Sequence, residues 1–488
     1  MRLMKIKNWT WLALLLLLTS LVLSSPAIAQ TPQAYDKLTF PPLSEVRIPP
    51  FERYVLSNGI TVYLMEDHRL PSIKGSAILG ISSLLEPAEK TGLAEITGSL
   101  LRSGGTKQHP PNQLNEILEN RAASIESSIG IDSGNVSFHS LTQDFEDVFK
   151  LFVEVMREPR FDQDQFELLK TQLKGRIARR NDNPGDITGR EFKKLIYSST
   201  SPYARTIEYE TLEKISANDP KDFYTQLEPQ SIILGIVGDF NSAKVKELIK
   251  QSLENWPPRK NQKSNITSSA KVNIESQAKT GGIYTINQPQ LNQSNVLLGQ
   301  LGGRIDSPDY PSLAVLNGVL NGFGGRLFNN VRSRKGLAYS VYGVWRANYN
   351  FPGLFIAGGQ TRSQETAAFI KAIDSEIDQI RSSQVNPDEL ALAKDSILNS
   401  FVFNFSNPSA SLNRLMTYEY FHYPSDFIFR YQDAVKNVTA ADLQRVAQEY
   451  LRPEQMVTLV VGNTQDIESS LEGLGKKIET IDIGQKIK

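Results

Sequence analysis

The chain has 488 residues, with 53 basic and 53 acidic side chains and no cysteine. This length is too great for one compact core and predicts more than one domain. The balanced charge argues against a nucleic-acid-binding protein, which usually carries a basic excess. The lack of cysteine excludes a disulfide scaffold, a thiol nucleophile and cysteine-ligated zinc.

Only four histidines remain for metal or base chemistry. They lie far apart in the sequence, at His68, His109, His139 and His422, and no two of them are four residues apart. Such isolated histidines are more typical of surface or packing positions than of metal ligands. The histidines alone therefore predict no metal site.

The N-terminus has the pattern of a secretory signal. A basic start is followed by an apolar stretch from Trp11 to Val22, and Ala27 and Ala29 fit a small-residue cleavage site. We therefore expect a signal peptide over residues 1–29, cleaved near Ala29, and a periplasmic or extracellular protein with no membrane attachment afterwards. The alternative is that the segment is kept as a membrane anchor, although its apolar core is short for that purpose.

A polar, low-complexity stretch divides the rest of the chain. Residues 257–277 contain few large apolar side chains and read as a linker. The predicted domains are therefore residues 30–256 and residues 278–488.

The two parts share weak internal similarity. Three segments of the first part, 74–80, 164–170 and 228–239, align in order with segments of the second part. The matching segments are 293–299, 388–394 and 453–463. Their constant order and nearly constant offset favour an internal duplication, and chance similarity between short amphipathic segments is the alternative.

Strands and helices are predicted in both parts. In the first part, residues 54–65 form a hairpin around Asn58-Gly59, since this dipeptide is a strong hairpin signal. The remaining predictions there are strands at 74–82 and 232–237 and helices at 142–157, 162–180 and 242–254. In the second part they are strands at 337–346 and 353–360 and helices at 362–381, 387–405 and 440–451. Strand clusters separated by consecutive helices predict an α+β fold in which each part packs a β-sheet against helices.

One segment resembles a known family. Residues 56–106 contain L-S-N-G, then E-P, then G-L-A followed by a further helical run. This pattern is similar to the N-terminal domain of the pitrilysin/insulinase family of inverted-motif zinc peptidases, which includes the mitochondrial processing peptidase. The resemblance implies two duplicated halves that together form one half of a clamshell.

The family's zinc motif is missing from this segment. In an H-x-x-E-H helix two histidines bind the zinc and the glutamate takes a proton from the metal-bound water. Here those three positions hold Glu95, Gly98 and Ser99, and Gly175 and Arg176 stand where the downstream glutamates would be. We therefore expect no catalytic residue, no bound metal and no cofactor.

The second part keeps a different motif of the family. Residues 320–346 resemble the segment that carries an arginine and, seven positions later, a tyrosine, here Arg332 and Tyr339. In the family this pair binds the substrate backbone near the scissile carbonyl, and both side chains are hydrogen-bond donors suited to that task. From the spacing alone, a solvated helix arginine and a strand tyrosine would be the simpler interpretation.

The combination is asymmetric, because the zinc site is lost and the arginine–tyrosine pair is kept. Some bacterial members of the family are heterodimers in which one subunit carries the zinc motif and the other carries the pair. The resemblance therefore implies a non-catalytic, substrate-binding subunit whose partners are a zinc-bearing homologous peptidase subunit and an extended peptide. The alternative is a structural or peptide-binding protein derived from the family, with no catalytic partner.

Overall fold

The computed structural model describes residues 46–257, 279–322 and 324–484. The predicted signal peptide and residues 258–277 of the predicted linker lie outside the described residues. Within the described residues, none of the helices is both long enough and apolar enough to cross a membrane.

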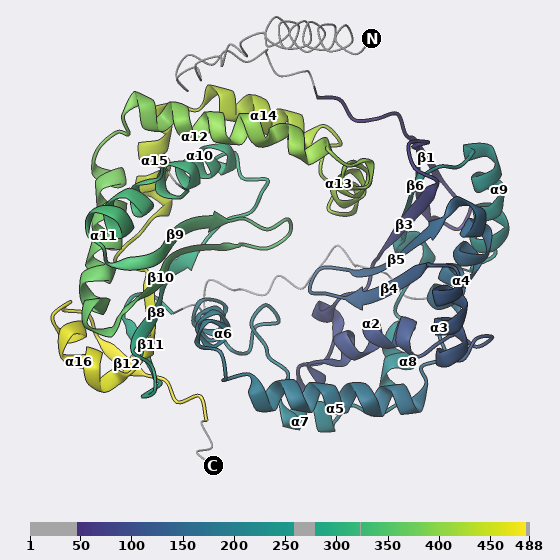
Figure 1. Cartoon of the computed structure of the whole chain (residues 1–488), viewed down its shortest axis with the longest axis horizontal. Coiled ribbons are helices and arrows are strands. Elements are labelled where there is room, and N and C mark those ends of the chain that lie inside the picture. Colours follow the sequence, from purple (N-terminus) through teal and green to yellow (C-terminus); the bar gives the residue numbers. More distant parts are fainter. Residues whose placement is uncertain (1–45, 258–278, 323, 485–488) are drawn as a thin grey trace, which may run out of the picture. The chain divides into compact units, whose positions relative to one another are not determined.

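Two six-stranded sheets form the framework (Figure 1). The first sheet has the order β1-β2-β6-β3-β5-β4. Its strands are β1 (Glu52–Val55), β2 (Thr61–Glu66), β3 (Ser72–Leu79), β4 (Ser124–Ile129), β5 (Gly134–Leu141) and β6 (Ile233–Gly238). The predicted hairpin is confirmed, since β1 and β2 pair antiparallel and Gly59 adopts the positive φ of 90° that its turn requires.

The second sheet has the order β12-β7-β11-β8-β10-β9. Its strands are β7 (Ile283–Asn287), β8 (Gln293–Leu301), β9 (Ala338–Arg346), β10 (Leu354–Arg362), β11 (Val457–Gly462) and β12 (Ile478–Thr480). Strands β7, β11, β8, β10 and β9 repeat the order and the directions of β2, β6, β3, β5 and β4, with one parallel pair in each set of five, β2 with β6 and β7 with β11. The sixth strands differ, since β12 pairs parallel with β7 and β1 pairs antiparallel with β2. The predicted duplication and the predicted α+β class are confirmed.

Helices cover both sheets. In the first half they are α2 (Leu93–Ser103), α3 (Pro111–Asn120), α4 (Phe145–Arg157), α5 (Gln163–Arg179), α6 (Pro184–Tyr197), α7 (Tyr209–Glu213), α8 (Asp219–Tyr224) and α9 (Ser242–Leu253). In the second half they are α10 (Tyr310–Leu320), the π-helix η6 (Leu327–Arg334), α11 (Thr366–Ser382), α12 (Pro387–Ser400), α13 (Pro408–Tyr420), α14 (Phe427–Asn437), α15 (Ala440–Tyr450) and α16 (Thr464–Glu472). The predicted helices all exist, but the one expected at 387–405 ends at Ser400 and continues as the 3₁₀-helix η8 (Phe401–Phe405).

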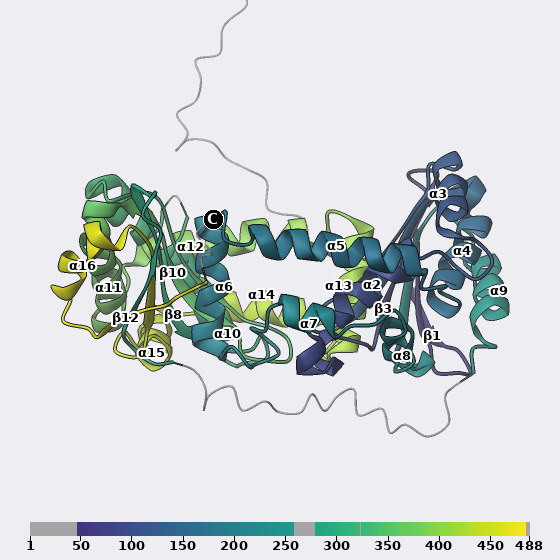
Figure 2. The ribbon, with the colours of Figure 1, turned by 90° about the horizontal axis from the view of Figure 1, so that it is seen from below.

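The two halves exchange one helix each. Helix α6 of the first half packs on β8 and β11 of the second sheet, and α13 of the second half packs on β2, β3 and β6 of the first sheet (Figures 1 and 2). Because the first sheet has α4 and α9 on its other face, β6 is buried at every residue, as β11 is in the second sheet. This explains why both strands read as continuous apolar runs.

The exchanged helices are held by apolar and polar contacts. Leu412, Leu415 and Met416 of α13 pack against Tyr63 and Met65 of β2. On the polar side, the guanidinium of Arg53 donates to both carboxylate oxygens of Glu419, one bond measuring 2.8 Å, and the Tyr63 hydroxyl donates to the same carboxylate. The Arg53 guanidinium holds the pKa of Glu419 below its ordinary value.

Candidate functional site

Helix α2 carries the altered zinc motif, and its first turn is held by a buried carboxylate. Glu86 accepts hydrogen bonds from the backbone N–H groups of Gly92, at 3.2 Å, and Ala94, at 2.9 Å. A carboxylate at this place satisfies N–H groups that have no partner within the helix. Burial raises the pKa of Glu86. The E-P and G-L-A elements of the family pattern therefore still shape this helix.

The positions of the missing zinc ligands come together in the structure. A carboxylate oxygen of Glu95 on α2 lies 2.7 Å from the guanidinium of Arg176 on α5. With Ser99, these two side chains line a small pocket of about 210 Å³ between the helices, whose other walls are Ile96, Leu169, Gln172 and Leu173. The structure thus brings Glu95, Ser99 and Arg176 to one place, where an ion pair replaces a metal site.

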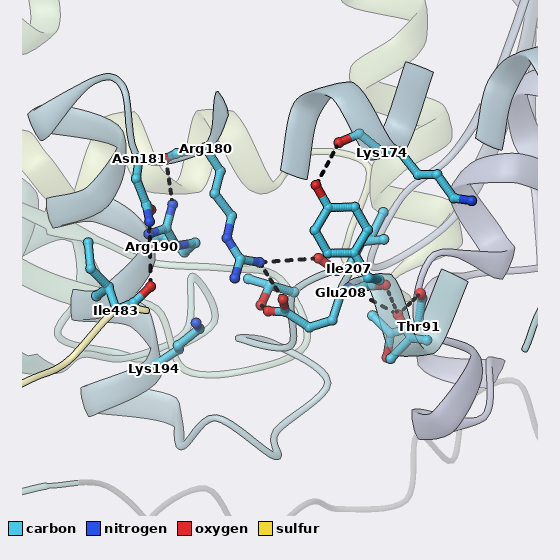
Figure 3. Close-up of polar contacts among 12 residues, drawn as sticks. Thr91, Lys174, Arg180, Asn181, Arg190, Lys194, Ile207, Glu208 and Ile483 are labelled. Atoms are coloured by element: carbon cyan, nitrogen blue, oxygen red, sulfur yellow. Dashed lines mark hydrogen bonds and ion pairs between the residues drawn. The ribbon is translucent and has the colours of Figure 1, made fainter. Parts of the chain in front are cut away.

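The end of α5 is fixed by a polar network (Figure 3). Arg180 pairs with the Glu208 carboxylate, and Arg190 donates at 2.8 Å to the Arg180 carbonyl and at 2.7 Å to the Asn181 side chain. This network holds the turn between α5 and α6, and therefore the helix from which Arg176 extends. The backbone from which the Arg176 side chain extends toward α2 is therefore held in place.

These residues do not fit a zinc ion. Zinc sites in proteins use imidazole, thiolate and carboxylate groups, and here one carboxylate faces a guanidinium and a hydroxyl. The base position is closed as well, because a Cβ added at Gly98 would lie 2.2 Å from the backbone nitrogen of Ile129 on β4. The Ser127 hydroxyl also donates to the Gly98 carbonyl at 2.6 Å. No glutamate side chain fits at position 98 unless α2 and β4 move apart.

The histidines lie elsewhere, and two of the four are paired with carboxylates. His68 contacts Asp239 at 2.7 Å and Glu66 at 3.2 Å, and His109 contacts Glu154 at 2.8 Å. Across residues 46–257, 279–322 and 324–484 there is no group of three or more His, Asp or Glu side chains that could hold a metal ion.

The arginine–tyrosine pair lies in the second half. The guanidinium carbon of Arg332 is 5.2 Å from the centre of the Tyr339 ring and 4.7 Å from the centre of the Phe328 ring. Both distances are in the range of cation–π contacts. Tyr339 is 84% exposed, so its hydroxyl faces solvent. The structure therefore places the two predicted side chains together and adds Phe328 to them.

The local backbone explains how the two residues meet. Arg332 is on the π-helix η6, where the Lys335 N–H donates to the Asn330 carbonyl at 3.2 Å, five residues back. Gly336 has φ of +62°, which a residue with a side chain adopts less readily, and it turns the chain into β9. π-helical segments are rare in proteins and are frequently found at functional sites.

Tyr339 occupies a β-bulge. Ser340 pairs with Gln360 and Ala338 pairs with Thr361, so Tyr339 is the extra residue on β9. Bulges bend a strand and re-aim a side chain, and they are common beside active sites. Because β9 is an edge strand of the second sheet, the bulge also leaves the tyrosine at an open edge.

Sequence reasoning missed the Phe328 contact, the bulge, the close approach at Gly98 and the ion pair between Glu95 and Arg176. The Phe328 contact had a signal, since Phe328 and Arg332 are four residues apart in a segment expected to be helical. The bulge and the contact between Gly98 and Ile129 depend on how distant parts of the chain pack together, so no signal in the sequence pointed to either.

Comparison with known proteins identifies the family. Residues 78–208 match the model described as "Insulinase (Peptidase family M16)", and residues 214–397 match the model described as "Peptidase M16 inactive domain". The chain belongs to peptidase family M16. It is a member that lacks the zinc-binding motif of the family's peptidases, as the residues at 95, 98 and 99 show.

Several M16 relatives span most of the chain. It is 21% identical to "Uncharacterized zinc protease YmxG" of Bacillus subtilis, over 74% of this chain and 86% of that protein. It is 21% identical to "Non-peptidase homolog YmxG" of Helicobacter pylori, over 83% of this chain and 92% of that protein. The same strain has "Zinc protease PqqE", 22% identical over 84% of this chain and 93% of that protein.

Solved structures show the same fold. A peptidase M16 inactive domain from Pseudomonas fluorescens matches with a TM-score of 0.73 and 22% identity, covering 85% of this chain and 98% of that chain. A protease from Helicobacter pylori matches with a TM-score of 0.72 and 21% identity, covering 85% of this chain and 99% of that chain.

Proposed function

We propose that this M16 protein is the non-catalytic, substrate-binding subunit of an exported, heterodimeric zinc peptidase that degrades peptides. A homologous subunit would bring the zinc and the base. The observation that carries this proposal is the contrast between two sites. The zinc positions hold an ion pair at Glu95 and Arg176, whereas Arg332 and Tyr339 remain together and accessible.

The chemistry of the kept pair supports a role in binding peptide. A guanidinium and a phenol donate hydrogen bonds, and these bonds stabilise the negative charge that develops on a carbonyl oxygen during cleavage. Both side chains lie at the edge strand β9, where an extended peptide can add by main-chain hydrogen bonds and so be bound with little dependence on its sequence. The relatives support a two-subunit system, since one bacterial strain has both a relative named a non-peptidase homologue and a relative named a zinc protease. The signal-like segment at 1–29 supports export.

Reconstitution with a zinc-bearing M16 homologue from the same source tests the proposal. We expect neither protein alone to cleave a peptide library, and the mixture to cleave it. Arg332→Ala should lower kcat of the mixture roughly 100-fold, the usual cost of removing one oxyanion donor. Tyr339→Phe, which keeps the ring over Arg332, should cost about tenfold or less, the value of one hydrogen bond.

The control is Lys335→Ala, which removes a neighbouring exposed positive charge and should leave cleavage unchanged. Binding of the two subunits, measured by analytical ultracentrifugation, should be unchanged in all three variants. Full cleavage by a mixture that carries Arg332→Ala and Tyr339→Phe together would show that the pair has no such role. Failure of any zinc-bearing homologue to bind would favour the alternative, a structural or peptide-binding protein without a catalytic partner.

A further inference from the structure

The guanidinium of Arg332 lies against two aromatic rings, and one of them belongs to a residue with no assigned role. We propose that Phe328 is a positioning residue that holds the Arg332 guanidinium in the orientation needed to bind a ligand oxygen. The inference deepens the proposed function and rests on it for its kinetic consequence, but the positioning itself can be measured without it.

The first step is the geometry of the guanidinium. Its carbon lies 4.7 Å from the Phe328 ring and 5.2 Å from the Tyr339 ring. Phe328 is the nearer ring and is half-buried, whereas Tyr339 is 84% exposed and is the unpaired bulge residue of β9. Phe328 is therefore the firmer of the two contacts.

The second step is that the helix beneath Phe328 is fixed. Its inner face buries Leu327 and Val331 in the core of the second half. The guanidinium of Arg326 donates to both oxygens of Glu389 on α12, at 2.8 and 2.9 Å. The Asn330 amide donates at 2.9 Å to Glu376 on α11.

Along η6, residues that contact the rest of the second half alternate with residues whose side chains point away from it. Residues 326, 327, 330 and 331 face inward through the contacts above, whereas residues 328 and 332 meet on the outside. The backbone that carries Phe328 cannot rotate without breaking these inner contacts. The Phe328 ring therefore extends from a backbone that is held in place, and the Arg332 guanidinium packs against this ring.

The third step is that the guanidinium donors of Arg332 are left free. In the described part of the chain, the Arg332 side chain has ring contacts but no hydrogen bond or ion pair, so its guanidinium N–H donors are available. A free arginine side chain loses much rotational entropy when it binds, and a side chain held in its bound orientation loses less. Aromatic faces bind the flat side of a guanidinium and leave its N–H edge open. Phe328 therefore prepares Arg332 to donate.

The positioning is tested by ¹⁵N relaxation of the Arg332 side-chain Nε–H group in the full chain, assigned by its loss in Arg332→Lys. Phe328→Leu should lower its order parameter clearly, and Phe328→Tyr should keep it. Phe328→Met serves as the second variant should the leucine variant not fold. An order parameter that is the same with and without the ring overturns the proposal.

The consequence is tested in the reconstituted peptidase. Phe328→Leu should lower kcat about two- to fivefold, the worth of an exposed cation–π contact, with KM unchanged. Phe328→Tyr should restore kcat. The matched control is Phe403→Leu, a phenylalanine on η8 that is 71% exposed, and it should change nothing. Equal kcat for Phe328→Leu and the wild type also overturns the proposal. A wild-type mixture that never cleaves peptide refutes the proposed function, and the relaxation experiment then still decides whether Phe328 positions Arg332.

Discussion

The corner between α2 and α5 in the first half and the corner between η6 and β9 in the second half have diverged in opposite ways. In the first corner a glycine lets the helix approach the edge strand β4, and an ion pair fills the ligand positions. In the second corner a π-helix, a positive-φ glycine and a bulge hold two donor side chains at the edge strand β9. In the first corner the two charged side chains pair with each other, whereas in the second the Arg332 and Tyr339 side chains lie together and keep their hydrogen-bond donors available. The difference shows that the first corner departs from a zinc site in its backbone packing at Gly98 as well as in its side chains.

The largest expected effect comes from Gly98, because it tests whether the first corner is closed by shape. Gly98→Ala should destabilise the protein by roughly 2–3 kcal/mol, since its Cβ would overlap backbone atoms of β4 that cannot swing away. Urea unfolding measures this as a lower midpoint with unchanged slope.

The matched control is Gly175→Ala on α5, where an added Cβ meets nothing within 4 Å. There the substitution should stabilise the protein by up to about 1 kcal/mol, through helix propensity alone. Equal effects at the two glycines would mean that α2 and β4 can separate easily and that the corner is not closed.

A second prediction separates the loss of ligands from the loss of space. The triple variant Glu95→His, Ser99→His and Arg176→Glu puts two imidazoles four residues apart on α2 and a carboxylate opposite them, without changing Gly98. It should bind zinc, and zinc at 100 times its Kd should stabilise it by about 2.7 kcal/mol. Calorimetric titration and thermal unfolding measure both.

This triple variant should still not cleave peptide, because the base glutamate is missing. The wild type and the variant that changes only Arg176→Glu serve as controls and should show no zinc-dependent stabilisation. A triple variant that binds no zinc would mean that the side chains at 95, 99 and 176 no longer converge as zinc ligands must.

The smallest effect concerns the contact that joins the two halves. Arg53 lowers the pKa of Glu419, so this carboxylate contributes stability that is present above its unfolded-state pKa near 4.5 and is lost as pH falls through and below that value. Thermal unfolding at pH 6 and at pH 4 should therefore show a larger drop for the wild type than for Glu419→Gln. Identical decreases in Tm for the two proteins would show that the ion pair between Arg53 and Glu419 does not stabilise the packing of α13 on the first sheet.

Much of the fold could be predicted from the sequence. The strands β6 and β11 are short apolar runs because helices cover both of their faces, and α4 shows its buried side through Phe145, Phe149 and Phe152. The exchanged helices α6 and α13 were not predicted. Their apolar residues pack on a sheet formed by the other half, and α6 has Gly185 and Gly189 among its residues, which weakens a helix pattern.

The sites were predictable only in part. The changes at Glu95, Gly98 and Ser99 can be read directly, because the motif that they replace has fixed spacing. The meeting of Glu95 with Arg176 links residues about 80 positions apart and depends on how α5 lies beside α2. The exposure of Tyr339 depends on the bulge, which shifts it out of the simple alternation expected for a strand.

The exchange of α6 and α13 sets an order of events during synthesis. The first sheet is complete once β6 ends at Gly238, and α9 ends at Leu253, but the helix that covers the second face of this sheet begins only at Pro408, more than 150 residues after Leu253. At usual elongation rates this is roughly eight to thirty seconds. For that time the face bearing Tyr63, Met65, Ile233 and Val237 has no cover of its own chain. The first half therefore completes its packing only after the second half has been synthesised and α13 has packed on the first sheet.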